Sequence, residues 1–115
     1  MQAHPLDHIL AGIDTLDLEP IKFKLTSEKD EYRWSREHAD RIEVAYRRFL
    51  LLMAKYPERA IAPTRDIDTF WHAHILDPRK YAADCQRVFG EFVHHHPYIG
   101  LHDDEADRQA HAAAG

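Results

Sequence analysis

The sequence predicts an all-α fold, a small bundle of four or five helices around one long central helix. Apolar residues recur mostly at intervals of three and four, which is the period of a helix and not of a strand. Only four glycines are present, and six prolines divide the chain into segments of helical length. With 115 residues, the chain has the size of one domain, which we assign to residues 1–115.

The N-terminal part predicts a short helix followed by an extended connector. In the helix, assigned to residues 1–15, Leu6, Ile9 and Ile13 lie on one apolar stripe. Residues 16–26 alternate apolar and polar side chains, as a strand does. Because no second strand-like segment is present to pair with it, we expect an extended connector that packs Ile21, Phe23 and Leu25 on the helices.

The central helix is predicted to begin near Ser27 and to end before Pro57. Ser27 followed by Asp30 is typical of an N-cap with an acid in the first turn. A helix of this extent would be about 43 Å long, so the other elements must pack along it. Its apolar stripe comprises Trp34, His38, Ile42, Ala45, Tyr46, Phe49, Leu52 and Met53.

Two further helices are predicted to form a hairpin. Thr64 can cap the first, and Asp77 with Pro78 can begin the second. We expect this second helix to continue toward Pro97, so that the run of three histidines before it lies in the last turn or at the exit. The acidic, alanine-rich tail, residues 103–115, is expected to be loosely held.

Composition narrows the classes of function. A net charge of −5 argues against a dedicated nucleic-acid binder, which normally has a basic face. The single cysteine, Cys85, excludes a disulfide scaffold. No apolar run approaches a membrane span, and the start lacks a signal-peptide layout. We therefore expect a cytoplasmic protein that binds neither nucleic acid nor a membrane.

The ten histidines are the unusual feature, and several lie in the predicted hairpin. Asp68 and His72 are four residues apart and therefore neighbours on one helix face. His95 is expected to meet them across the hairpin, because the linking turn is very short. A carboxylate and two imidazoles with an open position are typical of a catalytic or exchangeable metal site. We predict that Asp68, His72 and His95 bind zinc or iron, with copper as a further candidate.

His74, Cys85 and His38 are second-tier candidates for the same site, and each has a structural interpretation. His74 falls on the buried face, where a hydrogen-bonded core histidine is favoured, with Asp68 and His72 as a local pair. A lone cysteine on an apolar stripe is more often an inert hydrophobe than a thiolate. His38 lies on the stripe of the central helix and is also better interpreted as a core histidine.

Two classes of function follow from these residues. An open metal position would support metal-assisted chemistry on a small molecule, although no motif identifies that molecule. The competing hypothesis is a metal-free protein-interaction or accessory module with a structural histidine network. The partner, a protein or a small molecule, is not identified by the sequence, which leaves open whether the protein is an enzyme.

A longer pattern extends beyond these candidate residues. It reads Asp66-x-Asp68-x-x-Trp71-His72-x-His74-Ile75-Leu76, then Pro78, Tyr81, Asp84-Cys85, Phe89-Gly90 and His95. With Tyr46-Arg47-Arg48-Phe49-Leu50, it resembles the glycine-rich domain-containing protein family, a domain of unknown function, over about residues 16–100. The resemblance implies a stand-alone, bacterial-type form, because no glycine-rich tail follows. Plant members of the family are linked to development, stress and RNA. The resemblance implies no particular reaction for this chain.

Overall fold

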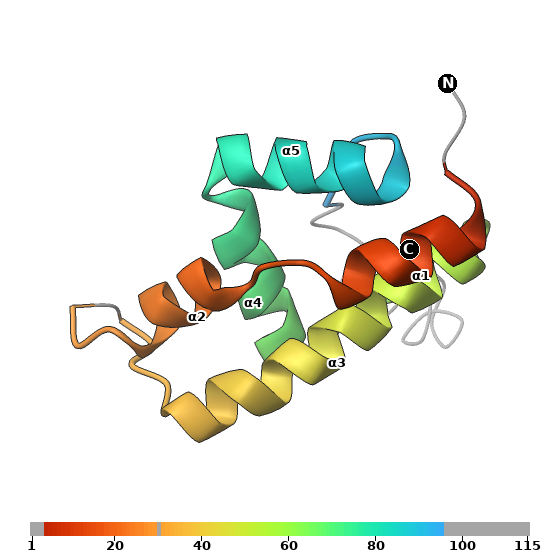
Figure 1. Ribbon diagram of the computed structural model, residues 1–115. Coiled ribbons are helices and arrows are strands. Elements are labelled where there is room, and N and C mark those ends of the chain that lie inside the picture. Colours follow the sequence, from red (N-terminus) through yellow and green to blue (C-terminus); the bar gives the residue numbers. More distant parts are fainter. Residues whose placement is uncertain (1–3, 30, 96–115) are drawn as a thin grey trace, which may run out of the picture.

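A computed structural model describes residues 4–29 and 31–95, and these residues form five helices and no strand (Figure 1). The predicted all-α bundle is therefore confirmed, with one helix longer than the others. The predicted tail, residues 103–115, lies outside the described residues. The helices are α1 (Leu6–Asp14), α2 (Glu19–Thr26), α3 (Arg36–Lys55), α4 (Arg65–Ile75) and α5 (Pro78–Phe89).

The long helix α3 organises the bundle. Helices α1 and α2 follow one another along α3, α4 crosses it, and α5 turns back to pack on α1 and α4 (Figure 1). No helix in the described ranges combines the length and the apolar character needed to cross a bilayer. The largest fully buried side chains are Leu18, Ile21, Leu25, Tyr46, Phe70, Trp71, His74, Tyr81 and Val88.

The prediction of an extended connector was wrong, because residues 19–26 form helix α2. Its alternating pattern also fits a helix, since Ile21 and Leu25 are four residues apart and both are buried. Phe23, which we expected to pack on the helices, lies on the opposite face and is 75% exposed. Pro20 occupies the first turn, where its missing N–H costs no helical hydrogen bond.

The start of the central helix was also predicted wrongly. Ser27 directly follows α2 as its C-cap, and α3 begins only after Ser35, whose side chain accepts a hydrogen bond from the His38 backbone N–H at 3.0 Å. The loop between them turns through Arg33, which has a φ of 48°. Helix α3 is therefore about 30 Å long rather than 43 Å. Its predicted end before Pro57 is confirmed.

A buried lysine joins α2 to α3. The Nζ of Lys22 lies 2.7 Å from Glu19, 3.0 Å from Asp40 and 2.6 Å from Glu43, and its side chain is only 5% exposed. Burial favours the neutral amine, but the hydrogen bonds to these three carboxylates outweigh it and raise the pKa of Lys22. The same bonds lower the pKa of Glu19 and of Asp40. The charged Lys22 thus joins α2 to α3 through ion pairs.

Helices α4 and α5 begin at the predicted residues, although the Asp77 side chain makes no capping hydrogen bond, and α5 ends earlier than predicted. The Thr64 side chain caps α4 by accepting from the Ile67 backbone N–H, and α5 starts with Pro78 after Asp77. However, α5 ends at Phe89, because Gly90 adopts a left-handed φ of 77°. Of the three histidines expected in its last turn, His94 and His95 therefore follow the helix, and His96 lies outside the described residues.

Close contacts hold α1 and the N-terminal segment against α5. A Cβ added at Gly12 would lie 3.1 Å from Cγ1 and 3.2 Å from Cα of Val88, so a larger residue would require Val88 to move by a few tenths of an ångström. The backbone N–H of His4 donates to the Phe89 carbonyl at 2.9 Å. Both contacts fix α1 beside the end of α5, where a pocket is found.

Candidate functional site

The most buried histidine, His74, lies between two partners on different helices. Its Nε2 is 2.8 Å from Oδ2 of Asp84 on α5, and its Nδ1 is 2.8 Å from the hydroxyl of Tyr46 on α3. A carboxylate only accepts, so Nε2 carries the proton and donates, and Tyr46 donates to Nδ1. Lys80, one turn before Asp84, lies 3.0 Å from the same carboxylate oxygen. The interpretation of His74 as a hydrogen-bonded core histidine is confirmed.

Burial favours the neutral forms of Tyr46 and His74, next to the ion pair of Lys80 and Asp84. Burial lowers the pKa of His74, although the hydrogen bond to Asp84 acts in the opposite direction. Burial also raises the pKa of Tyr46 and of Tyr81. Because Tyr46 is fully buried and His74 is 2% exposed, no substrate can reach them directly. The hydrogen bonds of Tyr46, His74 and Asp84 therefore join three helices, and these buried groups are not accessible to a substrate.

The predicted meeting of His95 with Asp68 occurs. His95 Nε2 donates to Asp68 Oδ1 at 2.5 Å, and its ring packs on Trp71 with centroids 4.4 Å apart. The helix end that we expected to carry His95 is absent, but the segment after Gly90 crosses α4 and delivers the imidazole to the same carboxylate.

The remaining predicted ligands lie apart from this pair. His72 is exposed one turn after Asp68, on the opposite side of α4 from His74. His38 Nε2 lies 2.9 Å from Oδ2 of Asp66, at the start of α4. Cys85 is buried, and burial raises the pKa of its thiol, which disfavours the thiolate that metals bind.

Within residues 4–29 and 31–95, no three histidine, cysteine, aspartate or glutamate side chains are grouped so that they could hold a metal ion. The described residues instead contain separate carboxylate–imidazole pairs, each joining α4 to another element. They also contain no buried side-chain nitrogen or oxygen that lacks a hydrogen-bond partner. Asp68 and His95 are together, and His72 does not join them.

A second hydrogen-bond chain fixes the segment that follows α5. Trp71 Nε1–H donates to the Tyr81 hydroxyl at 2.9 Å, and Tyr81 donates to the Val93 carbonyl at 2.5 Å. Together with the bond from His95 to Asp68, this holds residues 93–95 across the face of α4. The segment therefore forms a wall with defined position.

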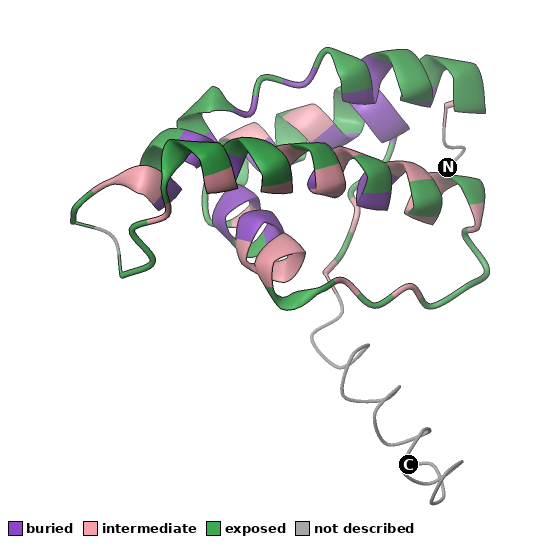
Figure 2. Ribbon diagram, turned by 90° about the horizontal axis from the view of Figure 1, so that it is seen from below, coloured by how far each residue is buried: buried purple, intermediate pink, exposed green. Residues whose placement is uncertain are grey.

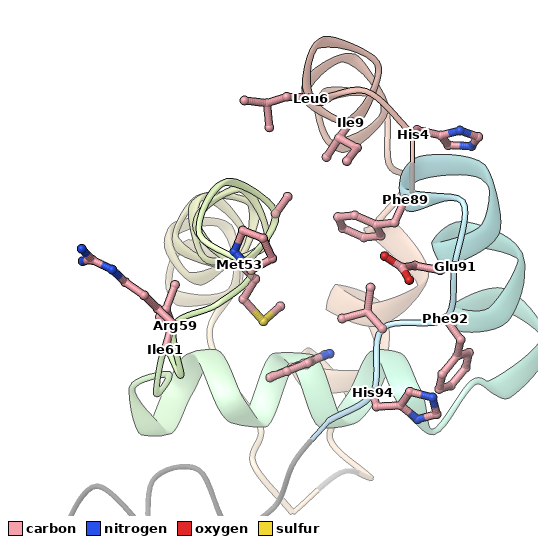
Figure 3. A pocket seen from close by; sticks show the side chains of 14 residues that line it. His4, Leu6, Ile9, Met53, Arg59, Ile61, Phe89, Glu91, Phe92 and His94 are labelled. Atoms are coloured by element: carbon pink, nitrogen blue, oxygen red, sulfur yellow. The ribbon is translucent and has the colours of Figure 1, made fainter. Parts of the chain in front are cut away.

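This wall, α1 and the end of α3 surround a pocket of about 450 Å³ (Figure 3). Leu6 and Ile9 extend from α1, Met53 from α3 and Phe89 from α5, and Trp71 contributes the face of α4. The polar lining residues lie in the segments that flank the helices: His4, Arg59, Glu91 and His94. Figure 3 shows Arg59 pointing away from the pocket and the Glu91 carboxylate extending toward it.

The chain is similar to known proteins over most of its length. The model of the UCP032817-like family matches residues 11–112, which include every helix except the start of α1. The chain belongs to the UCP032817-like family. This UCP032817-like domain is similar to "Glycine-rich domain-containing protein 1" of Arabidopsis thaliana, with 28% identity over 109 residues, and to "Glycine-rich domain-containing protein 2", with 34% identity over 74 residues.

These matches cover 72% and 56% of the UCP032817-like domain, which spans only 13% and 9% of the two plant proteins. The predicted resemblance to glycine-rich domain-containing proteins is therefore confirmed. No solved structure gives a significant match to the chain.

Sequence reasoning missed the partners that orient the histidines. Tyr46 was assigned to the core stripe, and Asp84 appeared only as part of the family pattern, although a signal was present. His74 and Asp84 lie on either side of the short turn at residues 76–77 and only ten residues apart, so their contact could have been considered from the sequence. No local rule connects His74 to Tyr46, which is 28 residues away.

Proposed function

We propose that this UCP032817-like domain is an accessory binding module whose pocket receives a small, largely apolar molecule carrying a hydrogen-bond donor such as an amine or a hydroxyl. The observation that supports the proposal is the pocket between α1, α3, α4 and α5. In this proposal the carboxylate–imidazole pairs are structural ties. We assign the module to the cytoplasm, because its one cysteine, Cys85, is buried and has no disulfide partner in the chain.

The size and lining of the pocket support a small-molecule ligand. Its volume of about 450 Å³ lies within the range of ligand sites, which are mostly apolar with a few convergent polar groups. Trp71, Phe89 and Phe92 provide aromatic faces that favour apolar groups and cations. Glu91 makes no hydrogen bond or ion pair with the residues that the structure describes, so its carboxylate is available to accept from a donor on the ligand.

The pocket wall is held before any ligand binds. Val93 is bonded through its carbonyl to Tyr81, and His95 is bonded to Asp68. A wall fixed in this way loses little conformational freedom when it is covered, which favours affinity. The aspartate–histidine pair thus contributes to binding by positioning the wall.

Tryptophan fluorescence can test the proposal, because Trp71 lines the pocket. In a Trp34→Phe background, Trp71 is the only tryptophan and reports binding directly. Hexylamine and hexanoate, which differ in the charge of their head group, are the probes. We expect hexylamine to give a saturable change in Trp71 emission and to bind about tenfold more tightly than hexanoate, as one charged hydrogen bond provides.

Two matched pairs of variants locate the effect. Glu91→Gln should remove the preference for the amine, and Glu37→Gln on α3, which is exposed, should not. Ala54→Leu places extra methyl groups in the pocket and should weaken both probes, whereas Ala82→Leu on the exposed side of α5 should leave them unchanged. If neither probe changes Trp71 emission, or if Ala54→Leu has no effect, the proposed function is wrong.

Metal binding is a second candidate function, favoured by the approach of Asp68 to His95 within 2.5 Å. These two side chains would supply two ligands, and His72 follows Asp68 by one helical turn. Zinc, iron or copper would then polarise a bound molecule or water at the open positions. His74 is less suitable as a ligand, since both of its ring nitrogens are bonded.

Elemental analysis of protein purified without a histidine tag tests this candidate. Stoichiometric metal that is lost in both His72→Ala and His95→Ala, and retained in His94→Ala, would support the site. Metal-free protein that fails to bind added zinc would exclude it. This outcome would leave the pocket proposal unaffected, because the fluorescence assay uses no metal.

A further inference from the structure

A second hollow lies on the outer side of α3 and has a different chemistry from the first pocket. It has a volume of about 370 Å³ and runs between α3 and residues 61–67. Ile61 contributes to both hollows, but no residue of α3 lines both. We call this second hollow the α3 groove. Figure 2, seen from below, shows the largely exposed face of α3.

Two unpaired arginines border the α3 groove. Arg41 and Arg48 are exposed, lie seven residues apart on α3, and make no ion pair or hydrogen bond with the residues that the structure describes. By contrast, Arg36 and Arg47 on the same helix are bonded to carboxylates. No aspartate or glutamate is among the described residues that line the groove. In a chain of net charge −5, the residues that line this groove therefore include two cations and no acid.

The surface between the arginines is apolar. Val44 is 52% exposed and Leu52 is 43% exposed, and both line the groove above the buried Phe49. Positions 41, 44, 48 and 52 follow the helical period, so cations and apolar side chains share one face of α3. Exposed apolar residues rimmed by charge are typical of an interaction site.

We propose that the α3 groove docks an acidic, amphipathic helical segment of a partner protein. Charge complementarity identifies this occupant. Arg41 and Arg48 are separated by about 10 Å along α3, which is the separation of two residues seven positions apart on any helix. A partner helix laid along α3 can therefore present a carboxylate to each arginine and apolar side chains to Val44 and Leu52 between them.

A nucleic acid fits the same surface less well. Two phosphate contacts give weak binding at physiological salt, and the negative charge of the rest of the chain opposes a polyanion. The apolar floor would also stay uncovered beneath a phosphate backbone. The docking proposal does not depend on the proposed function, because it uses different residues of α3 and a different class of ligand.

Fluorescence anisotropy tests the proposal with defined probes. The first probe is a labelled amphipathic peptide with glutamates seven positions apart and leucines between them. The second is the same peptide with lysines in place of the glutamates, and the third is a labelled single-stranded RNA. We expect saturable binding of the glutamate peptide only, with amide shifts in nuclear magnetic resonance spectra confined to α3 and residues 61–67.

Charge reversal supplies the matched control. Arg41→Glu with Arg48→Glu should weaken the glutamate peptide at least about tenfold, because both attractions become repulsions. Lys24→Glu with Arg79→Glu changes the net charge equally at exposed positions away from the groove and should have little effect. Val44→Asp should weaken binding as well. All substituted residues are exposed, so the variants should fold, which circular dichroism verifies.

Three outcomes would overturn the proposal. The glutamate peptide fails to bind, it binds equally after both charge reversals, or RNA binds more tightly and displaces it. None of these outcomes alters Trp71 fluorescence with hexylamine, so the two proposals fail independently.

Discussion

Removing the Tyr46 hydroxyl should destabilise the domain by an amount that the structure sets. Tyr46→Phe keeps the ring against Phe70, with centroids 4.9 Å apart, and deletes only the donor to His74 Nδ1. A buried acceptor is then left without a hydrogen bond, which costs about 1–3 kcal/mol. For a domain of this size the melting temperature should fall by roughly 4 °C for each kcal/mol.

Urea denaturation monitored by circular dichroism gives the free energy of unfolding. Tyr56→Phe is the matched control, because the Tyr56 hydroxyl has no hydrogen-bond partner among the described residues, and it should stay within about 0.5 kcal/mol of the parent. In a His74→Leu background, Tyr46→Phe should become neutral or stabilising, since the hydroxyl then has no acceptor. A loss below about 0.5 kcal/mol, or an equal loss in both backgrounds, would refute the reasoning.

Three other changes test the ties between helices. Lys22→Met should lower the free energy of unfolding by about 2 kcal/mol at pH 7, as measured by urea titration. This difference from the parent should become smaller as the pH falls below about 4.5, because the carboxylates with lowered pKa bind Lys22 only while they are ionised. Gly12→Ala should lower the melting temperature, because the clash with Val88 outweighs the gain of about 1 kcal/mol in helix propensity; a more stable variant would contradict it. Gly90→Ala should lose about 1–2 kcal/mol in the same melting assay, from the left-handed φ and the 3.2 Å approach to the His4 nitrogen, and an unchanged melting temperature would show that α5 does not need this turn.

The contrast between α2 and α5 illustrates how far a local pattern can be read. Ile21-Lys22-Phe23-Lys24-Leu25 fits both a strand and a helix, because residues four apart share a face in either structure. In the structure the segment is a helix packed on α3. From this helix Lys22 contacts three carboxylates, two of them on α3. At the end of α5 the signal was local, since a glycine just past the apolar stripe is typical of a helix C-terminus. The prediction followed Pro97 and ignored Gly90.

By itself, the sequence determined the all-α class and the starts of α4 and α5, which depend on helical periodicity and on residues close together in the chain. It also predicted that His95 approaches Asp68, 27 residues away, but through a helix end that does not form. Only the tertiary structure decided that His74 pairs with Tyr46 and Asp84, that His38 pairs with Asp66, and that His72 is left in solvent. A histidine ring carries equal potential for a metal, a carboxylate or water, and its partner is chosen by which distant side chain packing brings within hydrogen-bond reach.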